Sequence, residues 1–328
     1  MAYSKRITMK DVAREAGVAL GTVSRVVNGM PVGKNYQRSV EKAIEKLGYQ
    51  VNRQARALRS NQNSLVEVIL PALSDPFYSM LADSLCRELA HRSLQAMLCL
   101  TGGDFEQEQA YLLLPGQQTA GGVICLTDHS EFRIPNGIPI VSIDRVLGPG
   151  IPCVTSDNYS GGYLAAQTLM NSGCKSLAFL RAGPPLPGET EKRRDGFVCA
   201  CADAGVPFKS MCIGENASCS VLEDFLRAHL HGGCLDCDGL FCSTDLLACQ
   251  ILHALNQTGL SVPQDVQIIG YGGVKCFANQ EFCCSTIVPP VEEMAQLCVD
   301  LILQASPKQY SCSLQLPVSY AFGGTTRK

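Results

Sequence analysis

The sequence predicts an α/β protein with an all-helical N-terminal head and a larger body built from doubly wound parallel sheets. Three observations predict this class: short glycine-bounded helical patterns at the start, apolar runs alternating with amphipathic segments afterwards, and a charge that changes sign between the two parts. The chain has 328 residues, of which 46% are hydrophobic and 17% charged. This length accommodates two or three domains, and this composition is typical of a folded protein.

The head is expected to consist of three short helices with one shared apolar seam. Val12, Ala13 and Ala16 recur on one face of the first helix, and Val40, Ala43, Ile44 and Leu47 do the same on the third. Such a trio, with a glycine turn between the first two helices, describes a helix-turn-helix unit. The expected elements are residues 9–16 after the N-cap Thr8, residues 20–28, and residues 34–47, ended by Gly17, Gly29 and Gly48 respectively.

Charge is concentrated in this head. Residues 1–60 hold 12 Lys and Arg against 4 Asp and Glu, a net charge of +8, and the remainder carries −11. A basic end on an acidic protein indicates nucleic-acid contact confined to that end, because phosphate neutralisation is the main sequence-independent source of binding energy. A solvated charged face without a partner is the alternative that charge alone leaves open.

The second helix is the part of the head that we expect to read DNA. Val23, Val26 and Val27 face inward, so a helix of this width can present its other side to the major groove. Arg25 is the candidate for a bidentate guanine contact, although viewed alone these could be ordinary exposed positions. The outward residues are Leu20, Gly21, Thr22, Ser24, Arg25 and Asn28.

Residues 52–64, "NRQARALRSNQNS", form a candidate linker between head and body. Arginines recur every three residues, and a polar run follows them. A helix this short is marginal in water, so we expect the segment to order only against a partner. Leu58, an apolar side chain among arginines, is then a candidate wedge for the minor groove.

The body is predicted from near-continuous apolar runs that alternate with helical patterns, which favours parallel sheets covered on both faces. We expect two lobes, divided near residues 156–160, with late segments crossing back to the first lobe. The cleft between the lobes is the default ligand site in such a body. The expected strands are residues 65–70, 95–100, 121–126, 139–144, 176–181, 239–242 and 266–271.

Several other classes of function are disfavoured. The 18 cysteines fall mostly in apolar segments, and the single CxxC, Cys234 and Cys237, has no partner pair at zinc-site spacing, so we predict no metal site and no cofactor. No apolar run reaches the ~20 residues of a membrane helix and no signal peptide is evident, which predicts a cytoplasmic protein and argues against an exported solute-binding protein. No nucleophile elbow, P-loop or dinucleotide fingerprint is present, so an enzyme is not expected.

A set of motifs in fixed order resembles the lac repressor/galactose repressor family of bacterial transcription regulators over nearly the whole chain. The motifs are "DVAREAGVALGTVSRVVNG", "LGYQVNRQARALRS", "LSDPFY", "SIDR", "SDNYSGG", "STDLLA" and "VPQDVQIIGYGG". The resemblance implies a homodimeric repressor in which the head and a hinge helix bind a near-palindromic double-stranded operator. A body similar to periplasmic sugar-binding proteins would bind a small effector and control DNA binding allosterically. The implied domains are residues 1–50 (helix-turn-helix), 51–63 (hinge) and 64–328 (effector binding and dimerisation).

The resemblance also implies site residues. DNA contacts would fall on Thr8 and the outward residues of the second helix, with Asn52, Ala55 and Leu58 of the hinge in the minor groove. Ala19 stands where a serine commonly caps the reading helix, and Gly21 has no side chain with which to read a base. The operator sequence therefore does not carry over from a relative.

By the resemblance, effector contacts would fall on six residues, which include one arginine, two carboxylates and two aromatic rings. Such a set suits a polyhydroxylated ligand, for example a sugar or sugar derivative, because the charged groups can bond adjacent hydroxyls. Thr244 replaces the family's usual Asn, and Gly272–Gly273 replace its usual acidic pair. The ligand is then different, bound differently or absent, and Asp144 with Arg193 could instead pair with each other at the cleft rim. The six residues are Phe77, Tyr78, Asp144, Arg193, Thr244 and Asp245.

Overall fold

The computed structural model describes the chain as two compact units, residues 1–63 and 64–328. The described residues are 7–27, 30–49, 65–113, 121–129, 131–183, 188–213, 219–231, 234–276, 281–304 and 313–328. Within them, no helix is both long enough and apolar enough to pass through a membrane.

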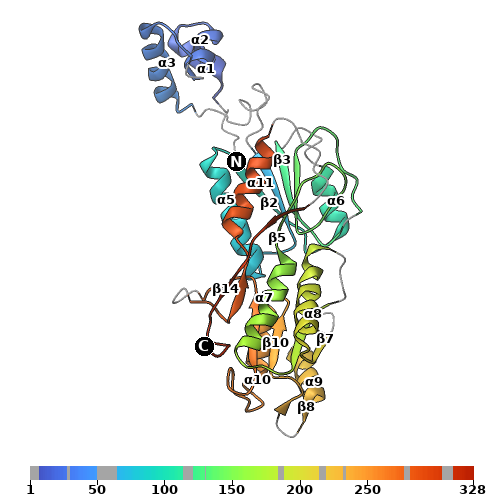
Figure 1. The fold of residues 1–328 in the computed structure, drawn as a ribbon. Coiled ribbons are helices and arrows are strands. Elements are labelled where there is room, and N and C mark those ends of the chain that lie inside the picture. The colour runs from blue at the N-terminus through green and yellow to red at the C-terminus, as the bar shows by residue number, and fades with distance from the viewer. Residues whose placement is uncertain are drawn as a thin grey trace. The chain divides into compact units, whose positions relative to one another are not determined.

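The first unit contains the three helices that the sequence predicts: α1 (Met9–Ala16), α2 (Leu20–Val27) and α3 (Lys34–Leu47) (Figure 1). Their shared core is small, and Val12, Val23 and Val40 are each fully buried in it. At the end of α1, Gly17 adopts φ 63° and its N–H bonds back to the helix, a left-handed turn that glycine adopts without strain. The predicted last residue of the second helix, Asn28, and the whole hinge segment lie outside the described residues.

The first lobe of the body is a six-stranded parallel sheet in the order β13-β5-β4-β3-β1-β2. Helices α5 (Pro76–His91) and α11 (Val291–Leu303) pack together over one face, and α6 (Phe105–Leu113) lies over the other (Figure 1). The strands are β1 (Leu65–Leu70), β2 (Gln95–Leu100), β3 (Gly122–Leu126), β4 (Ile140–Ile143), β5 (Cys153–Ser156) and β13 (Ser313–Leu316).

The second lobe is a six-stranded sheet in the order β14-β12-β11-β10-β6-β7, parallel except for the edge strand β14. Helices α7 and α8 cover one face and α9 and α10 the other. The strands are β6 (Leu177–Ala182), β7 (Phe208–Ile213), β10 (Gly239–Cys242), β11 (Gln267–Tyr271), β12 (Thr286–Val288) and β14 (Ser319–Ala321), with a small hairpin of β8 (Leu230–His231) and β9 (Cys234–Leu235). The helices are α7 (Asn158–Asn171), α8 (Lys192–Ala204), α9 (Cys219–His229) and α10 (Asp245–Leu255), preceded by the short 3-10 helix η2 (Glu189–Glu191).

The chain passes between the lobes three times: from β5 to α7, from β12 to α11, and from β13 to β14. The predicted fold class is therefore confirmed. The late segments α11 and β13 lie in the first lobe. Each crossing leaves a strand at its carboxyl-terminal end: β5, β12 or β13. The loops that follow strands of both lobes therefore lie close to the crossings.

Glu67 is a buried acid in the middle of β1. Its side chain is 0% exposed, and neither carboxylate oxygen has a hydrogen-bond partner among the described residues. Burial raises the pKa of Glu67 from 4.5 to about 7. The folded state then binds the proton more tightly than the unfolded chain does. The contribution of Glu67 to the free energy of unfolding is therefore most favourable below pH 4.5 and is lost as the pH rises towards 7.

We therefore expect Glu67→Gln to stabilise the protein more at pH 8 than at pH 5.5, by about 1–2 kcal/mol in the free energy of unfolding. Thermal melts of both proteins across this range check the prediction, and the difference corresponds to a few degrees. Glu131→Gln removes an exposed carboxylate and serves as the control, with no pH-dependent gain expected. A Glu67→Gln effect that does not vary with pH would contradict the buried-charge explanation.

Candidate functional site

The exposed side of α2 carries the residues predicted to contact DNA. Val23 is fully buried, whereas Leu20 is 44% exposed and Gly21 and Arg25 are also exposed. Thr22 and Ser24 are half-buried at the edge of this face. The valines thus fix the orientation of α2 and leave one face of mixed polar and apolar groups towards solvent.

Thr8 has a structural role at the start of α1. Its backbone N–H and its hydroxyl both donate to the carboxylate of Asp11, at 3.0 and 2.6 Å. Asp11 also lies 3.4 Å from Arg14. These contacts hold the first turn of α1 and leave the exposed Thr8 near the helix N-terminus, where a phosphate would be favourable.

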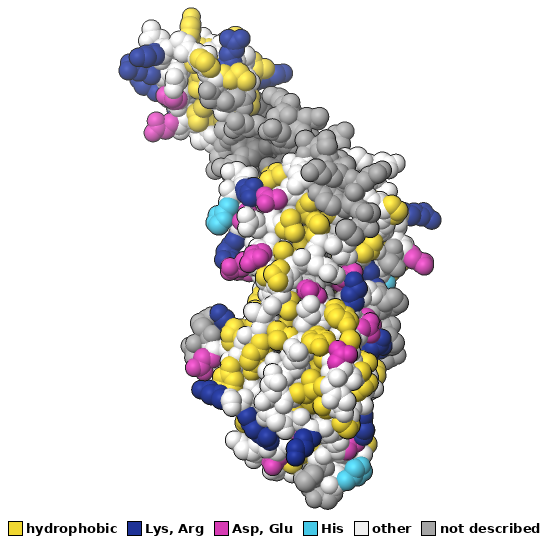
Figure 2. Space-filling model, viewed as in Figure 1, with side chains coloured by type: hydrophobic (Ala, Val, Ile, Leu, Met, Phe, Trp, Pro, Cys, Tyr) yellow, Lys and Arg dark blue, Asp and Glu magenta, His cyan; other side chains and the backbone are white. Residues whose placement is uncertain are grey.

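The basic side chains of the head are mostly uncompensated. Lys46 pairs with Glu15 at 2.5 Å and Arg14 with Asp11. Within the described part of the head, no ion pair engages Lys10, Arg25, Lys34, Arg38 or Lys42. Figure 2 shows Lys and Arg side chains projecting from this unit. Its positive charge is therefore available to an external polyanion.

The second candidate site is a pocket of about 250 Å³ in the body, between its two lobes. It is built where strands β1, β3 and β4 of one lobe and β6, β10 and β11 of the other end, the usual place for a ligand in open α/β folds. Its volume lies just below the range of drug-sized sites, which fits a small ligand. The lining residues are Asp75, Phe77, Tyr78, Leu126, Thr127, Asp128, Asp144, Arg145, Phe179, Arg181, Ala182, Thr190, Glu191, Arg193, Ser243, Thr244, Tyr271 and Gly272.

Arg193 is held at the base of this pocket by three contacts. Its Nε donates to Asn158 at 2.7 Å, its Nη1 donates to the carbonyl of Ser243 at 2.7 Å, and its guanidinium carbon lies 3.6 Å from the centre of the Tyr271 ring. Only 8% of the residue is exposed. A planar guanidinium fixed on both an aromatic face and two oxygens is rigid, so its remaining N–H groups are pre-oriented towards the pocket.

Two glycines place Arg193 there by letting α7 and α8 touch. A Cβ at Gly162 would lie 1.8 Å from the carbonyl oxygen of Arg193, and a Cβ at Gly196 would lie 1.9 Å from that of Tyr159. Both distances are far below contact, so any larger residue would push the helices apart. The close approach brings the start of α8 against the start of α7, where Asn158 lies.

Asp144 stands on the opposite lobe and connects to Arg193 indirectly. Its carboxylate accepts from the hydroxyl of Thr155 at 2.5 Å, and that hydroxyl oxygen accepts from the Asn158 side chain at 3.0 Å. Within the described residues Asp144 and Arg193 form no direct ion pair, so the chain of hydrogen bonds replaces the pairing that the sequence left open. Asp144 also has φ 57°, a left-handed conformation rare outside glycine and typical of functional positions.

Burial governs the protonation of this pocket. It raises the pKa of Asp144, and the nearby Arg193 guanidinium opposes that rise. It also raises the pKa of Tyr78 and of Tyr271, so both phenols are neutral near pH 7 and can donate hydrogen bonds. The Tyr271 hydroxyl already lies 2.7 Å from that of Ser156, across the lobes.

Five of the six residues predicted to bind an effector line the pocket: Phe77, Tyr78, Asp144, Arg193 and Thr244. Thr244 also caps α10, since its hydroxyl accepts from the N–H of Leu247 at 3.2 Å. Asp245 lies behind the pocket wall: it is 2% exposed, and its carboxylate accepts from the N–H of Val274 at 2.7 Å and the hydroxyl of Thr286 at 2.6 Å. Burial raises the pKa of Asp245 to about 6.

Sequence reasoning missed the other charged lining residues. Arg145 is 6% exposed, lies 3.8 Å from Asp128, and its Nε has no hydrogen-bond partner among the described residues. Arg181, at the end of β6, pairs with Glu191 at 2.9 Å. The motif "SIDR" contains Arg145, and its position directly after a strand was a usable signal.

Comparison with known proteins identifies relatives of both parts of the chain. Residues 8–52 match the family model of bacterial regulatory proteins, lacI family, and residues 166–326 match that of a periplasmic binding protein-like domain. The chain is 32% identical to the ribose operon repressor of Bacillus subtilis (98% of this chain, 99% of the relative) and 29% identical to the sucrose operon repressor of Pediococcus pentosaceus (97% and 98%). The solved lac repressor dimer bound to operator and the anti-inducer ONPF superposes with a TM-score of 0.80 at 22% identity, over 98% of this chain and 99% of that one.

Proposed function

The chain belongs to the lacI family of bacterial regulatory proteins, and on that premise we propose that it represses transcription from an operator under the control of a small carbohydrate bound between the lobes of its body. It acts in the cytoplasm as a homodimer, as the dimeric lac repressor suggests, and catalyses no reaction. The observation that carries the proposal is the hydrogen-bonded connection from Arg193 to Asp144 at the pocket, because a ligand there touches groups that join the two lobes.

DNA reading is assigned to the exposed face of α2. Arg25 contacts a guanine edge, Leu20, Gly21, Thr22 and Ser24 lie beside it, and the remaining lysines and arginines of the head contact phosphates. A contact by Asn28, which lies outside the described residues, rests on the family resemblance. Thr8 contacts the backbone from the start of α1. The proposed hinge contacts of Asn52, Ala55 and Leu58 rest on the family resemblance, with Leu58 entering the minor groove as a wedge.

The pocket favours a neutral polyol over an anion. Three arginines line it, but so do four carboxylates, and two of the arginines already lie beside acids. A sugar phosphate would therefore bring negative charge to a pocket without surplus positive charge. The aromatic residues Phe77, Tyr78, Phe179 and Tyr271 offer apolar faces for a sugar ring, while the charged groups satisfy its hydroxyls.

Gly272 makes the pocket wall of the second lobe less acidic than the resemblance would suggest, and Thr244 places a hydroxyl there in place of an amide. Gly272 has φ 148° and lines the pocket with backbone alone. In this proposal Asp128, Asp144 and Arg145 therefore make the discriminating hydroxyl contacts. Asp245 acts from behind the wall by holding the backbone of Val274.

A thermal-shift screen tests the ligand assignment. We expect one or more neutral mono- or disaccharides to raise the melting temperature, with a stabilisation of about 2.7 kcal/mol at 100 times the dissociation constant. Sugar phosphates and nucleosides at the same concentration should give smaller shifts. If the phosphates stabilise the protein and their neutral parents do not, the charge argument is wrong.

A further inference from the structure

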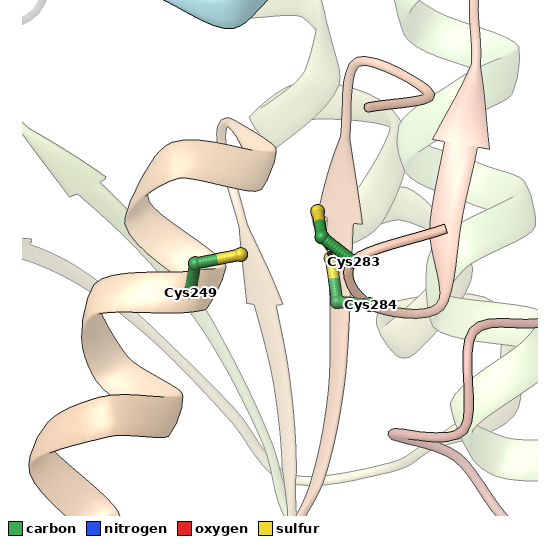
Figure 3. Close-up of side chains that lie close together, drawn as sticks. All are labelled: Cys249, Cys283 and Cys284. Carbon is green, nitrogen blue, oxygen red and sulfur yellow. Dashed lines mark hydrogen bonds between the residues drawn. The ribbon is translucent and has the colours of Figure 1, made fainter. Parts of the chain in front are cut away.

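Three cysteine side chains meet in the second lobe, where Cys249 approaches a pair of adjacent cysteines that lies more than thirty residues further along the chain. Cys249 lies on α10, and Cys283 and Cys284 lie in the segment that leads into β12. Figure 3 shows the Cys249 sulfur directed from its helix towards the other two. All three Sγ atoms lie within 4.8 Å of one another, and those of Cys283 and Cys284 are 4.0 Å apart.

This separation is close to what a shared metal ion requires. With a metal–sulfur bond of about 2.3 Å, three sulfurs around one ion lie about 3.8–4.0 Å apart. Side-chain movements of less than about 1 Å would therefore complete the site. Thiolates are soft ligands that select ions such as Cu(I), Zn²⁺ and their heavier thiophilic relatives over Mg²⁺ or Ca²⁺.

The cluster is accessible although it is mostly buried. Cys284 is fully buried, whereas Cys249 and Cys283 are only partly buried. Cys249 also lines a cavity of about 250 Å³ between α9 and α10, together with Leu222, His253 and Gln257. The cavity therefore leads as far as Cys249, and Cys283 is itself partly exposed.

The three thiols already lie in mutual contact, so little rearrangement separates the empty cluster from a coordinated one: the Cys283 and Cys284 sulfurs are 4.0 Å apart. A cation that binds all three sulfurs as thiolates displaces their protons to solvent.

We propose that Cys249, Cys283 and Cys284 form a binding site for one soft metal cation, coordinated by three thiolate sulfurs. The site is separate from the sugar pocket, and its test does not depend on the proposed function. Its nearest link to that pocket is Asp245, whose carboxylate oxygen lies 3.6 Å from the Cys284 sulfur and whose preceding residue, Thr244, lines the pocket.

Titration of the reduced full-length protein with Cd²⁺, in the presence of millimolar glutathione, tests the proposal. We expect one ion to bind per chain, with sulfur-to-metal charge-transfer absorption in the ultraviolet. Cys249→Ser, Cys283→Ser and Cys284→Ser should each weaken binding by about 100-fold or more, since each removes a direct ligand. Cys86→Ser, which changes a half-buried thiol in the other lobe, should leave it unchanged.

Alkylation of the wild-type protein gives a readout that needs no variant. Iodoacetamide labelling mapped by mass spectrometry should show Cd²⁺ protecting Cys249 and Cys283 while the exposed Cys212 stays reactive. Equal binding in all four variants, or protection of Cys212 alone, would overturn the proposal. The proposal would also be overturned if the three cysteines formed a disulfide on oxidation but bound no Cd²⁺ in the reduced protein.

Discussion

Arg193→Ala is expected to abolish the response of operator binding to the sugar while leaving operator affinity itself nearly unchanged. The variant loses a guanidinium that donates to Asn158 and Ser243 and stacks on Tyr271. Hydrogen bonds to a charged group contribute about 1.5–3 kcal/mol each, so sugar affinity should fall by about 100-fold or more. Operator affinity is retained because the head is a separate compact unit with its own core.

The measurement is a sugar titration of the wild type and the variant, each bound to a fluorescent duplex selected from random DNA by the wild-type protein. Arg193→Lys is the matched control: it keeps the charge but cannot bond two oxygens in a fork or stack equally well, so an intermediate response is expected. A variant that responds to the sugar as the wild type does would remove Arg193 from the site. Loss of DNA binding together with the response would indicate misfolding, which the variant's melting curve detects independently.

Arg25→Ala is expected to reduce affinity for the selected duplex by about 1–3 kcal/mol per site, and affinity for random DNA much less. Arg25 is exposed on α2, beside a helix face fixed by the buried Val23. Lys42→Ala is the matched control, since it removes one exposed positive charge from α3. Lys42→Ala should weaken binding to both duplexes equally. It should also reduce the slope of the logarithm of the binding constant against the logarithm of salt concentration by about one.

Anisotropy titrations on the selected and a scrambled duplex, across a series of salt concentrations, separate the two variants. Equal losses on both duplexes for Arg25→Ala would mean that Arg25 contacts only phosphate. The base-reading role would then have to move to other residues of the same face.

Local patterns were sufficient to predict the head and half of the described strands. The valine spacing and the glycine stops fix α1, α2 and α3, since both act within a few residues along the chain. The missed strands are short or lie at a sheet edge. β7 is an edge strand with mostly exposed residues, β5 and β13 have four residues each, β12 and β14 have three, and β8 and β9 have two. Outside the β8–β9 hairpin, their pairing depends on neighbours that are distant in sequence, and no local signal marks them.

The pocket was predictable where a motif ended a strand and much less so elsewhere. Asp144 directly follows β4, and Phe77 and Tyr78 begin α5 after β1, whereas Arg181 lies on β6, which enters the pocket wall because the second sheet places it beside β10. The inward turn of Asp245 has a similar origin: a Cβ at Gly270 would lie 2.2 Å from its carboxylate, so a glycine on a neighbouring strand makes the room. The cysteine cluster arises in the same way, from α10 and the start of β12.

If pocket occupancy controls DNA affinity, a sugar bound between the lobes must change how tightly the protein holds its duplex. The dissociation constant of the wild-type protein for its selected duplex is measured at fixed salt, with and without the sugar that stabilises the protein in the thermal screen. We expect the sugar to change this dissociation constant by about 5- to 150-fold, the usual range of coupling between two sites. By reciprocity, adding the duplex should change the protein's affinity for the sugar by the same factor. An unchanged dissociation constant, with the sugar demonstrably bound, would contradict it.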